Sequence, residues 1–538
     1  MKRNFGRLAD ELFDILVVGG GIHGAAIARE AACRGLKTAL IEQGDFGQAT
    51  SANSLKIIHG GLRYLQQADF KRMRQSIKAR RMFMEMAPHL VHPQPFLIPV
   101  YGHGMRGKEA MAAGLAVNDL LSWDRNRSLS PDNLIPNGKV ISREECLAIL
   151  PHIKKRGLTG GAVWYDGLAA NTERLTLEFI LSASEMGAAV ANYVRATSWV
   201  VEGGTIMGVQ AEERISRTPL TIRSRWVVNA AGPWLNSFFK DSPNADHLPV
   251  YWTKGINLII DRPMFSGYGV GLGEDQSPKT LGKAEKKRGR LFFFVPWQGR
   301  TMVGTAYNRY NGDLEHFRLE VGDIQDFLDD LNIIYPSGGL TLKDVSFFHA
   351  GLLPLSEDQD LADRQAEPDR HFSLIDHEPL LKIQGLISVK GTKYTTAPLV
   401  AEKVVDLIST RGDTMLSRRG DTKAVFPYDY DRPTLLNDLI KMSQVRIKGK
   451  EATIARHLYQ NYGPKSKLIV EVLLNNPASG RLISEDPTVT AAEIVHGVRE
   501  EWALKLSDVV FRRTDLGQFH CPSPEALQAV AEIMAKEL

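Results

Sequence analysis

The sequence has few cysteines, no long hydrophobic run and almost no net charge, and each shortage excludes a class of protein. Its three cysteines are too far apart for a disulfide framework or a cysteine-rich metal site, so they favour a reducing compartment. No stretch reaches the roughly 18 apolar residues of a membrane-spanning helix, and the first twelve residues do not resemble a secretory signal. A balance of 66 basic against 62 acidic residues does not indicate a nucleic-acid partner. We therefore expect a cytoplasmic protein, either free or resting on the inner face of the cytoplasmic membrane.

The N-terminal fifty residues carry the pattern of a dinucleotide-binding site. An apolar run at 13–18 is followed by G-x-G-x-x-G, a small-residue helix at 25–35 and a second strand at 37–41. The three glycines are Gly19, Gly21 and Gly24. They permit a tight turn, the approach of a pyrophosphate and close packing of the helix, and the helix N-terminus favours phosphate. Glu42 ends the second strand, where an acid binds a ribose hydroxyl; a solvated strand-end carboxylate is the alternative.

The segment after Glu42 separates FAD from NAD. Residues 49–65 read ATSANSLKIIHGGLRYL and closely resemble the flavin-wrapping segment of the FAD-dependent glycerol-3-phosphate dehydrogenases, approximately ATSxxSSKLIHGGLRYL. Further matches follow in order over nearly the whole chain, including VVNAAGPW (227–234), FFFVPW (292–297), AGLLPL (350–355), KGTKYTTAPLVAE (390–402) and FRRTDLGQF (511–519). The resemblance implies FAD as the cofactor.

The resemblance also implies an α/β fold with three parts. We expect an FAD-binding Rossmann-like domain of the glutathione-reductase/D-amino-acid-oxidase type, an antiparallel β-sheet substrate cap and a C-terminal helical domain. The first two occupy residues 1–425, with the cap at approximately 80–160 and 245–350, and the helical domain occupies 426–538. The helical tail is compatible with a homodimer.

Small and hydroxyl-bearing residues in the matching loops are the candidate flavin contacts. Hydroxyl groups bind phosphate and ring atoms, whereas glycine and alanine let the backbone pass close to a flat ring. The candidates are Thr50, Ser51, Ser54, Gly60, Gly61, Ala231, Gly232, Gly391 and Thr392. Each loop has the alternative of a tight turn between packed elements. No metal site is expected.

The family oxidises a secondary alcohol beside a phosphate by hydride transfer to FAD N5, and its electrons pass to a quinone or another acceptor. The resemblance implies that Arg63, Tyr64 and Arg370 bind substrate and that Lys393 is catalytic. Arginine suits a phosphate because its planar fork pairs two oxygens. Surface charges or structural ion pairs are the alternative for Arg63 and Lys393. His59 is a candidate base, or a histidine packed beneath the ring.

Four positions depart from the family pattern. Leu353 stands where the family has the arginine of SGVRPL, and Pro398 stands where it has the arginine of KLTTYR. Leu55 replaces a flavin-loop serine, and His349 stands where a tyrosine is common. We interpret these changes as a retuned substrate pocket in which His349 is a candidate catalytic contact; a hydrogen-bonded histidine near a strand end is the alternative. The hypothesis is that glycerol 3-phosphate is turned over poorly.

Two other functions stay open at this point. One is a flavin enzyme acting on a different hydroxy acid or an amine, and the other is a non-catalytic flavin-bound metabolite sensor. The segment 104–125 is amphipathic with Trp123 near its end, which is compatible with a membrane-surface helix that reaches quinone or with a helix packed on the core.

Overall fold

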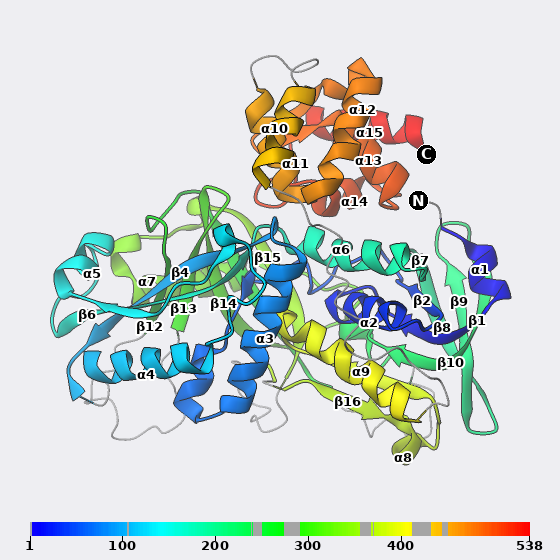
Figure 1. Ribbon diagram of the computed structural model, residues 1–538, viewed down its shortest axis with the longest axis horizontal. Coiled ribbons are helices and arrows are strands. Elements are labelled where there is room, and N and C mark those ends of the chain that lie inside the picture. The colour runs from blue at the N-terminus through cyan, green and yellow to red at the C-terminus, as the bar shows by residue number, and fades with distance from the viewer. Residues whose placement is uncertain are drawn as a thin grey trace.

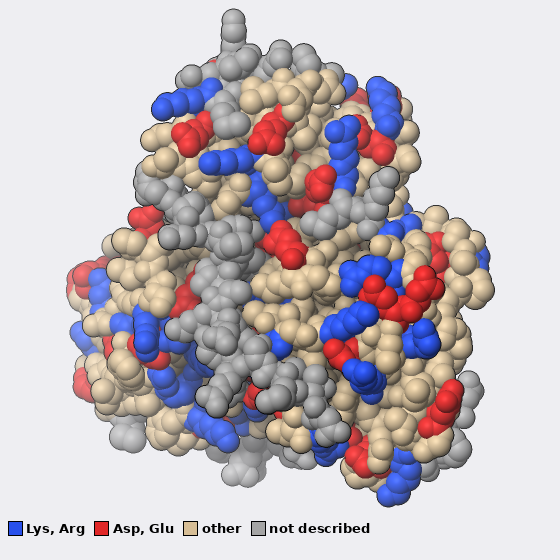
Figure 2. Space-filling view, turned by 45° about the vertical axis from the view of Figure 1, so that its right-hand side comes forward, with Lys and Arg blue, Asp and Glu red and all other residues tan. Residues whose placement is uncertain are grey.

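The computed structural model describes residues 3–104, 107–237, 239, 250–273, 291–355, 367–369, 371–411, 432–443 and 450–538. Two large sheets lie side by side, and a mainly helical domain lies above them and contacts both halves (Figure 1). Lys, Arg, Asp and Glu side chains are interspersed over the face seen in Figure 2, in keeping with the small net charge. Among the described residues, no helix is long and apolar enough to cross a membrane.

The N-terminal sheet has the central strand order β16-β17-β10-β1-β2-β7, and β8 and β9 extend it as an antiparallel hairpin. All neighbours from β17 to β7 run parallel, as the resemblance implies. The strands are β1 (Leu12–Val18), β2 (Thr38–Ile41), β7 (Ala189–Ala191), β8 (Val194–Glu202), β9 (Thr205–Glu213), β10 (Thr218–Asn229), β16 (Ser373–Asp376) and β17 (Leu386–Lys390).

Three helices cover one face of this sheet (Figure 1). They are α2 (Ile22–Cys33), α6 (Thr172–Glu185) and α9 (Ala397–Arg411), and the short helices α1 (Phe5–Asp10) and α8 (His377–Leu381) lie nearer its edges. Helix α2 can pack closely because its buried positions are mostly alanine, isoleucine and Gly24. It starts three residues earlier than the expected helix at 25–35, so its first turn begins directly after Gly21.

One expected strand is divided in the structure. The apolar run at 190–201 predicts a single strand, but β7 ends at Ala191 and β8 starts at Val194. Tyr193 has a φ of 58°, which redirects the chain between them. Consequently β7 completes the parallel sheet, whereas β8 turns away to pair with β9.

The second sheet has the order β15-β11-β14-β13-β12-β4-β6-β3, with β5 paired to β6. It is antiparallel except where β12 meets β4, which are parallel. The strands are β3 (Ile57–Ile58), β4 (Val91–Tyr101), β5 (Lys139–Ile141), β6 (Leu158–Ala169), β11 (Trp252–Ile260), β12 (Gly269–Gly273), β13 (Leu291–Trp297), β14 (Arg300–Tyr310) and β15 (Val345–Pro354). Around it lie α3 (Phe70–Met86), α4 (Lys108–Leu121), α5 (Arg143–Ile149) and α7 (Val321–Ile334).

The C-terminal part contains α10 (Arg432–Ser443), α11 (Glu451–Tyr462), α12 (Ser466–Asn475), α13 (Ala491–Glu500), α14 (Leu506–Asp508) and α15 (Pro524–Glu537). The sequence Thr490–Glu493 predicts a capping box, and the structure forms it at the start of α13; Pro524 opens the last helix after Ser523. This domain also holds a hairpin of β18 (Leu482–Glu485) and β19 (Thr488–Thr490), which the helical expectation did not include. The boundary placed at 425/426 lies outside the described residues.

Candidate flavin site

A cavity of about 2820 Å³ is lined by residues of both large sheets. Its wall includes the β1–α2 turn, the loop after β2, the ends of β10 and β17, and the cap strands β11, β14 and β15. Nearly every candidate cofactor residue is in that wall: Gly19, Gly21, Glu42, Thr50, Ser51, Ser54, Gly61, Ala231, Gly232, Gly391 and Thr392. Gly24 and Gly60 are not among the lining residues.

The β1–α2 turn has the geometry that its glycines require. Gly19 has a φ of 110°, a conformation that side-chain-bearing residues rarely adopt. A Cβ atom on Gly24 would lie 1.9 Å from the carbonyl oxygen of Gly19, so this position tolerates no side chain. Ser51 Oγ accepts a hydrogen bond of 2.9 Å from Ile22 N at the start of α2. A hydroxyl and a helix N-terminus therefore meet where the pyrophosphate is expected.

Glu42 lies in the cavity wall with both carboxylate oxygens bound to backbone. Its Oε2 accepts from Gly20 N at 2.6 Å, and its Oε1 accepts from Gly44 N at 2.9 Å. Burial raises the pKa of Glu42, and the nearby carboxylate of Asp45 adds to the rise. The two backbone bonds hold the acid at the end of β2, where a ribose hydroxyl would donate to it.

The HGGLRYL segment crosses the cavity wall between the two sheets. Tyr64 stacks under the ammonium group of Lys393, 4.6 Å from the ring centroid, and its hydroxyl contacts Lys393 Nζ. Burial, followed by the positive charge of Lys393, lowers the pKa of His59 to about 4. His59 is therefore neutral near pH 7. The structure thus brings the candidate site residues His59, Tyr64 and Lys393 together.

Arg63 also lies in the cavity wall, where its side chain is exposed. Burial raises the pKa of the Tyr307 hydroxyl; Glu367 adds to this rise and Arg63 opposes it. Tyr307 and Glu367 line the same cavity. The substrate end of the cavity thus contains a guanidinium, a phenol and a carboxylate.

Two buried polar atoms in the wall indicate that a ligand fits this cavity. Thr392 Oγ1 and His23 Nε2 are buried and have no hydrogen-bond partner among the described residues. A Cβ atom on Gly391 would lie 2.5 Å from the His23 ring, so the backbone passes close to it. Free hydroxyl and imidazole groups beside a glycine loop suit the hydrogen-bonding edge of a flavin ring.

Two family models match this chain and together cover most of its length. The model described as FAD dependent oxidoreductase matches residues 14–407, and the one described as C-terminal domain of alpha-glycerophosphate oxidase matches residues 429–538. The chain is 30% identical to a glycerol-3-phosphate dehydrogenase of Synechocystis sp., over 95% of this chain and 90% of that protein. This chain belongs to the FAD-dependent glycerol-3-phosphate dehydrogenase family. Its cofactor is FAD.

Two further glycerol-3-phosphate dehydrogenases are similar to this chain over nearly its full length. This chain is 29% identical to an aerobic glycerol-3-phosphate dehydrogenase of Staphylococcus aureus, over 100% of this chain and 92% of that protein. The glycerol-3-phosphate dehydrogenase of Bacillus halodurans, solved in complex with FAD, is 25% identical with a TM-score of 0.72. That similarity covers 99% of this chain and 92% of the other.

The position of His349 speaks against the catalytic role that its place in the family pattern suggests. His349 is buried outside the cavity wall, between the rings of Trp297 and Phe347, and its Nε2 bonds to the carbonyl oxygen of Gln518 at 3.0 Å. Burial lowers its pKa to about 3. It is a hydrogen-bonded core histidine at the contact between β15 and the C-terminal domain. Arg370 lies outside the described residues.

The other departures from the family pattern fall in different places. Leu353 lines the substrate end of the cavity, whereas Pro398 is buried in the first turn of α9, outside the wall. Leu55 lines the cavity beside Gly304. Only Leu353 and Leu55 therefore change the surface that a substrate meets.

Several residues of the site carry no local sequence signal. Asp166 accepts hydrogen bonds from Gly60 N, Arg80 Nη1 and Trp164 Nε1, and so fixes the first of the two adjacent glycines. Lys56, which is buried and lines the cavity, pairs with Glu173 at 2.9 Å. A second chain of bonds joins the flavin loop to the cap: Thr305 Oγ1 donates to Asn257 Oδ1 at 2.7 Å, and Asn257 Nδ2 donates to Asn53 O at 3.2 Å.

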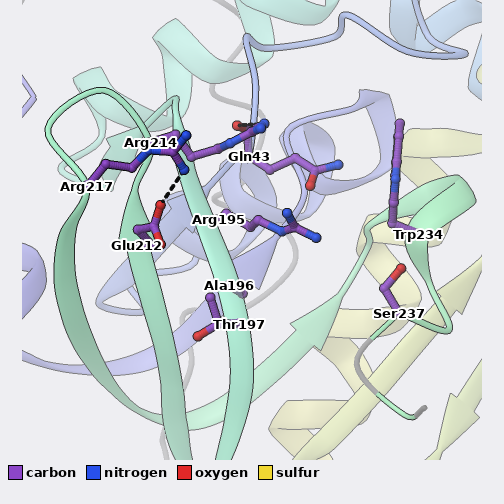
Figure 3. Close-up of a pocket in the computed structure, with 9 residues that line it drawn as sticks. All are labelled: Gln43, Arg195, Ala196, Thr197, Glu212, Arg214, Arg217, Trp234 and Ser237. Carbon is purple, nitrogen blue, oxygen red and sulfur yellow. Dashed lines mark hydrogen bonds and ion pairs between the residues drawn. The ribbon is translucent and has the colours of Figure 1, made fainter. Parts of the chain in front are cut away.

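A smaller hollow of about 220 Å³ lies next to Gln43, just beyond Glu42. Figure 3 shows its residues, with Arg217 paired to Glu212 at 2.9 Å and Arg195 pointing into the hollow. Arg214 donates to the carbonyl oxygen of Gln43 at 3.1 Å. Gln43 and Arg195 also line the large cavity, so this hollow extends its nucleotide end.

The close approach at Gly24 generates a testable prediction. Gly24→Ala places a methyl group against the Gly19 carbonyl, so we expect a loss of at least about 2 kcal/mol in the free energy of unfolding and loss of FAD binding. Gly322→Ala in α7 is the matched control, because nothing lies within 4 Å of its added Cβ. Denaturant unfolding and flavin absorbance of the purified variants measure both effects. Retention of FAD by Gly24→Ala would contradict the assigned turn geometry.

Proposed function

We propose that this protein is an FAD-dependent dehydrogenase that oxidises the secondary alcohol of glycerol 3-phosphate, or of a related phosphorylated polyol, to a ketone. The observation that carries the proposal is the single cavity that joins the glycine turn and Glu42 to His59, Tyr64, Lys393 and Arg63. Its support is the full-length similarity to glycerol-3-phosphate dehydrogenases. Bound FAD supplies the two-electron acceptor for the alcohol carbon.

The chain's own residues supply proton transfer and charge. His59 is the proposed base: its imidazole is neutral near pH 7 because burial and Lys393 lower its pKa to about 4, so it has a free lone pair for the hydroxyl proton. The ammonium group of Lys393 stabilises the negative charge that develops on the substrate oxygen. The Tyr64 hydroxyl, in contact with Lys393 Nζ, fixes the direction of that ammonium group.

Arg63 is the proposed partner of the substrate phosphate. Its exposed guanidinium lies in the cavity wall and forms no ion pair with another described residue. A phosphate is paired well by a guanidinium, but Leu353 offers only an apolar surface where a second arginine is expected. Arg370 remains a proposed substrate contact on sequence grounds alone.

Leu353 and Glu367 also favour a second candidate substrate class. Both line the cavity, and an apolar group and a carboxylate at the substrate end select against a doubly charged phosphate. A hydroxy acid or another substrate of lower negative charge is therefore the alternative. Lys393 and His59 both line the cavity, which favours an active enzyme over a flavin-bound sensor.

The cavity further supports a lipid-soluble electron acceptor. One part of its wall is apolar and includes Ile98, Phe293 and Leu65, together with Met111 and Leu115 from α4. The outer surface of α4 exposes Leu120 at 73%, and Trp123 just beyond it is 76% exposed. We infer that α4 rests on the inner face of the cytoplasmic membrane and that a quinone reaches the flavin beside it. A homodimer through the helical domain stays a prediction.

Anaerobic flavin reduction tests the substrate proposal. We expect glycerol 3-phosphate to bleach the oxidised-flavin absorption slowly in the unaltered enzyme, because one charge-assisted phosphate contact is missing. Leu353→Arg should raise kcat/KM by about tenfold or more, the value of one such contact. Leu353→Met, which keeps the volume without the charge, is the control.

Rapid bleaching of the unaltered enzyme, with no gain in Leu353→Arg, would contradict a retuned pocket. Bleaching by hydroxy acids or amines but not by phosphorylated polyols would establish the alternative substrate class.

Vesicle binding tests the membrane proposal. We expect the double substitution Leu120→Ser and Trp123→Ser to weaken binding to phosphatidylglycerol-containing vesicles by about a hundredfold or more, since each buried side chain contributes about 1.5–3 kcal/mol. Leu468→Ser removes an exposed leucine from α12 on the helical domain and is the control. Co-sedimentation measures the bound fraction. Equal binding of the double variant and the unaltered protein would contradict the assignment to α4.

A further inference from the structure

The helical domain reaches the flavin-binding loop through two adjacent arginines. Arg513 Nη1 and Nη2 each lie 2.8 Å from a carboxylate oxygen of Asp45, and Arg512 Nε lies 2.5 Å from Oδ2. Asn192 Nδ2 adds a fourth donor at 3.0 Å. Asp45 has no exposed surface, so its carboxylate is fully occupied by these partners.

The buried charges around Asp45 compensate one another. Arg512 also pairs with Asp508 at 2.7 Å, and Asp508 accepts a further bond of 2.7 Å from the Tyr193 hydroxyl. Arg513 Nε donates to the carbonyl oxygen of Glu501 at 2.9 Å. The two guanidinium groups hold the pKa of Asp45 well below its usual range. Removing one arginine therefore leaves charge that is buried and unbalanced.

Asp45 occupies a particular place in the cofactor loop. It lies three residues after Glu42 and six before Ser51, both of which line the cavity. Gly47 N donates to Gly20 O at 3.0 Å, so the loop is bonded to the β1–α2 turn as well. Asp45 itself is outside the cavity wall. A shift of Asp45 would move the ribose-binding acid and the phosphate-side hydroxyl without removing either.

We infer that the contact of Asp45 with Arg512 and Arg513 positions the FAD-binding loop, so that FAD affinity depends on the docking of the C-terminal helical domain. Asp45, Arg512 and Arg513 are positioning residues, because they act through Glu42 and Ser51. By thermodynamic reciprocity, bound FAD must then stabilise the docked helical domain.

A second arginine provides a matched comparison. Arg174 of α6 is fully buried, as Arg513 is, and pairs with Glu501 of the helical domain at 2.6 Å. It spans the same two domains but makes no bond to residues 42–54. Losing Arg174 weakens the domain contact, whereas losing Arg513 weakens the domain contact and releases the loop.

The test compares Arg513→Gln with Arg174→Gln in the full chain. FAD is removed and titrated back, and the Kd is taken from quenching of flavin fluorescence. We expect Arg513→Gln to raise the Kd for FAD by about tenfold or more, the effect of one charge-assisted contact. Arg174→Gln should lower the Tm but keep the Kd within about twofold. Asp45→Asn removes the same contact from the loop side and should raise the Kd for FAD by a similar factor. It therefore tests the inference even if Arg513→Gln folds poorly.

Two results would overturn the inference. One is an unchanged FAD Kd in both Arg513→Gln and Asp45→Asn. The other is an equal rise in Arg174→Gln, which would assign the loss to general loosening of the domains. Hydrogen exchange gives an independent reading: FAD should slow exchange of the amides at 508–513 in the unaltered protein and not in Asp45→Asn. These readouts involve no substrate, so they are separate from the proposed dehydrogenase activity.

Discussion

One constraint governs the structure: the doubly negative pyrophosphate and the large flat ring of FAD must lie directly against the protein backbone. Gly24 lets α2 approach β1 so closely that a methyl group would overlap the Gly19 carbonyl. That approach aims the positive end of α2 at the phosphates and places Ser51 on its first free N–H group. The parallel sheet then brings the ends of β2, β10 and β17 to the same edge, where their loops can follow the cofactor.

The part of the site that local sequence could predict is the part that local backbone geometry imposes. Glycine spacing, the acid at Glu42 and the HGGLRYL segment are encoded within short windows, and the structure places them in one cavity wall. The strands at 13–18 and 37–41 and the helix at 25–35 follow from hydrophobic period in the same way, and they correspond to β1, β2 and α2. The resemblance to a family extended this reading to the cap and to the helical domain.

What the sequence could not predict are contacts between distant residues. Asp166 beside Gly60, Asn257 beside Asn53 and Arg513 beside Asp45 are separated by more than a hundred positions, and no spacing rule links them. The left-handed turn at Tyr193 likewise divides a run that reads as one strand. The family pattern suggested a role for His349 because a tyrosine is common at its place, whereas in the structure its ring is bonded to the carbonyl oxygen of Gln518, 169 positions away.

In this enzyme the loops that bind the cofactor are bonded both within the nucleotide domain and to the helical domain. The residues at the substrate end of the cavity can change more freely. The change to Leu353 alters the cavity surface without touching the cofactor loops, so substrate preference can shift while flavin chemistry persists. The central claim is that this chain oxidises the alcohol carbon of glycerol 3-phosphate or a close relative. Single-turnover reduction of the flavin with glycerol 3-phosphate carrying deuterium at C2 tests it most directly. The account predicts that the flavin bleaches markedly more slowly with the deuterated than with the unlabelled substrate, because the C2–H bond breaks in that step. If the flavin is not reduced by either compound or by any phosphorylated polyol, the central claim is contradicted.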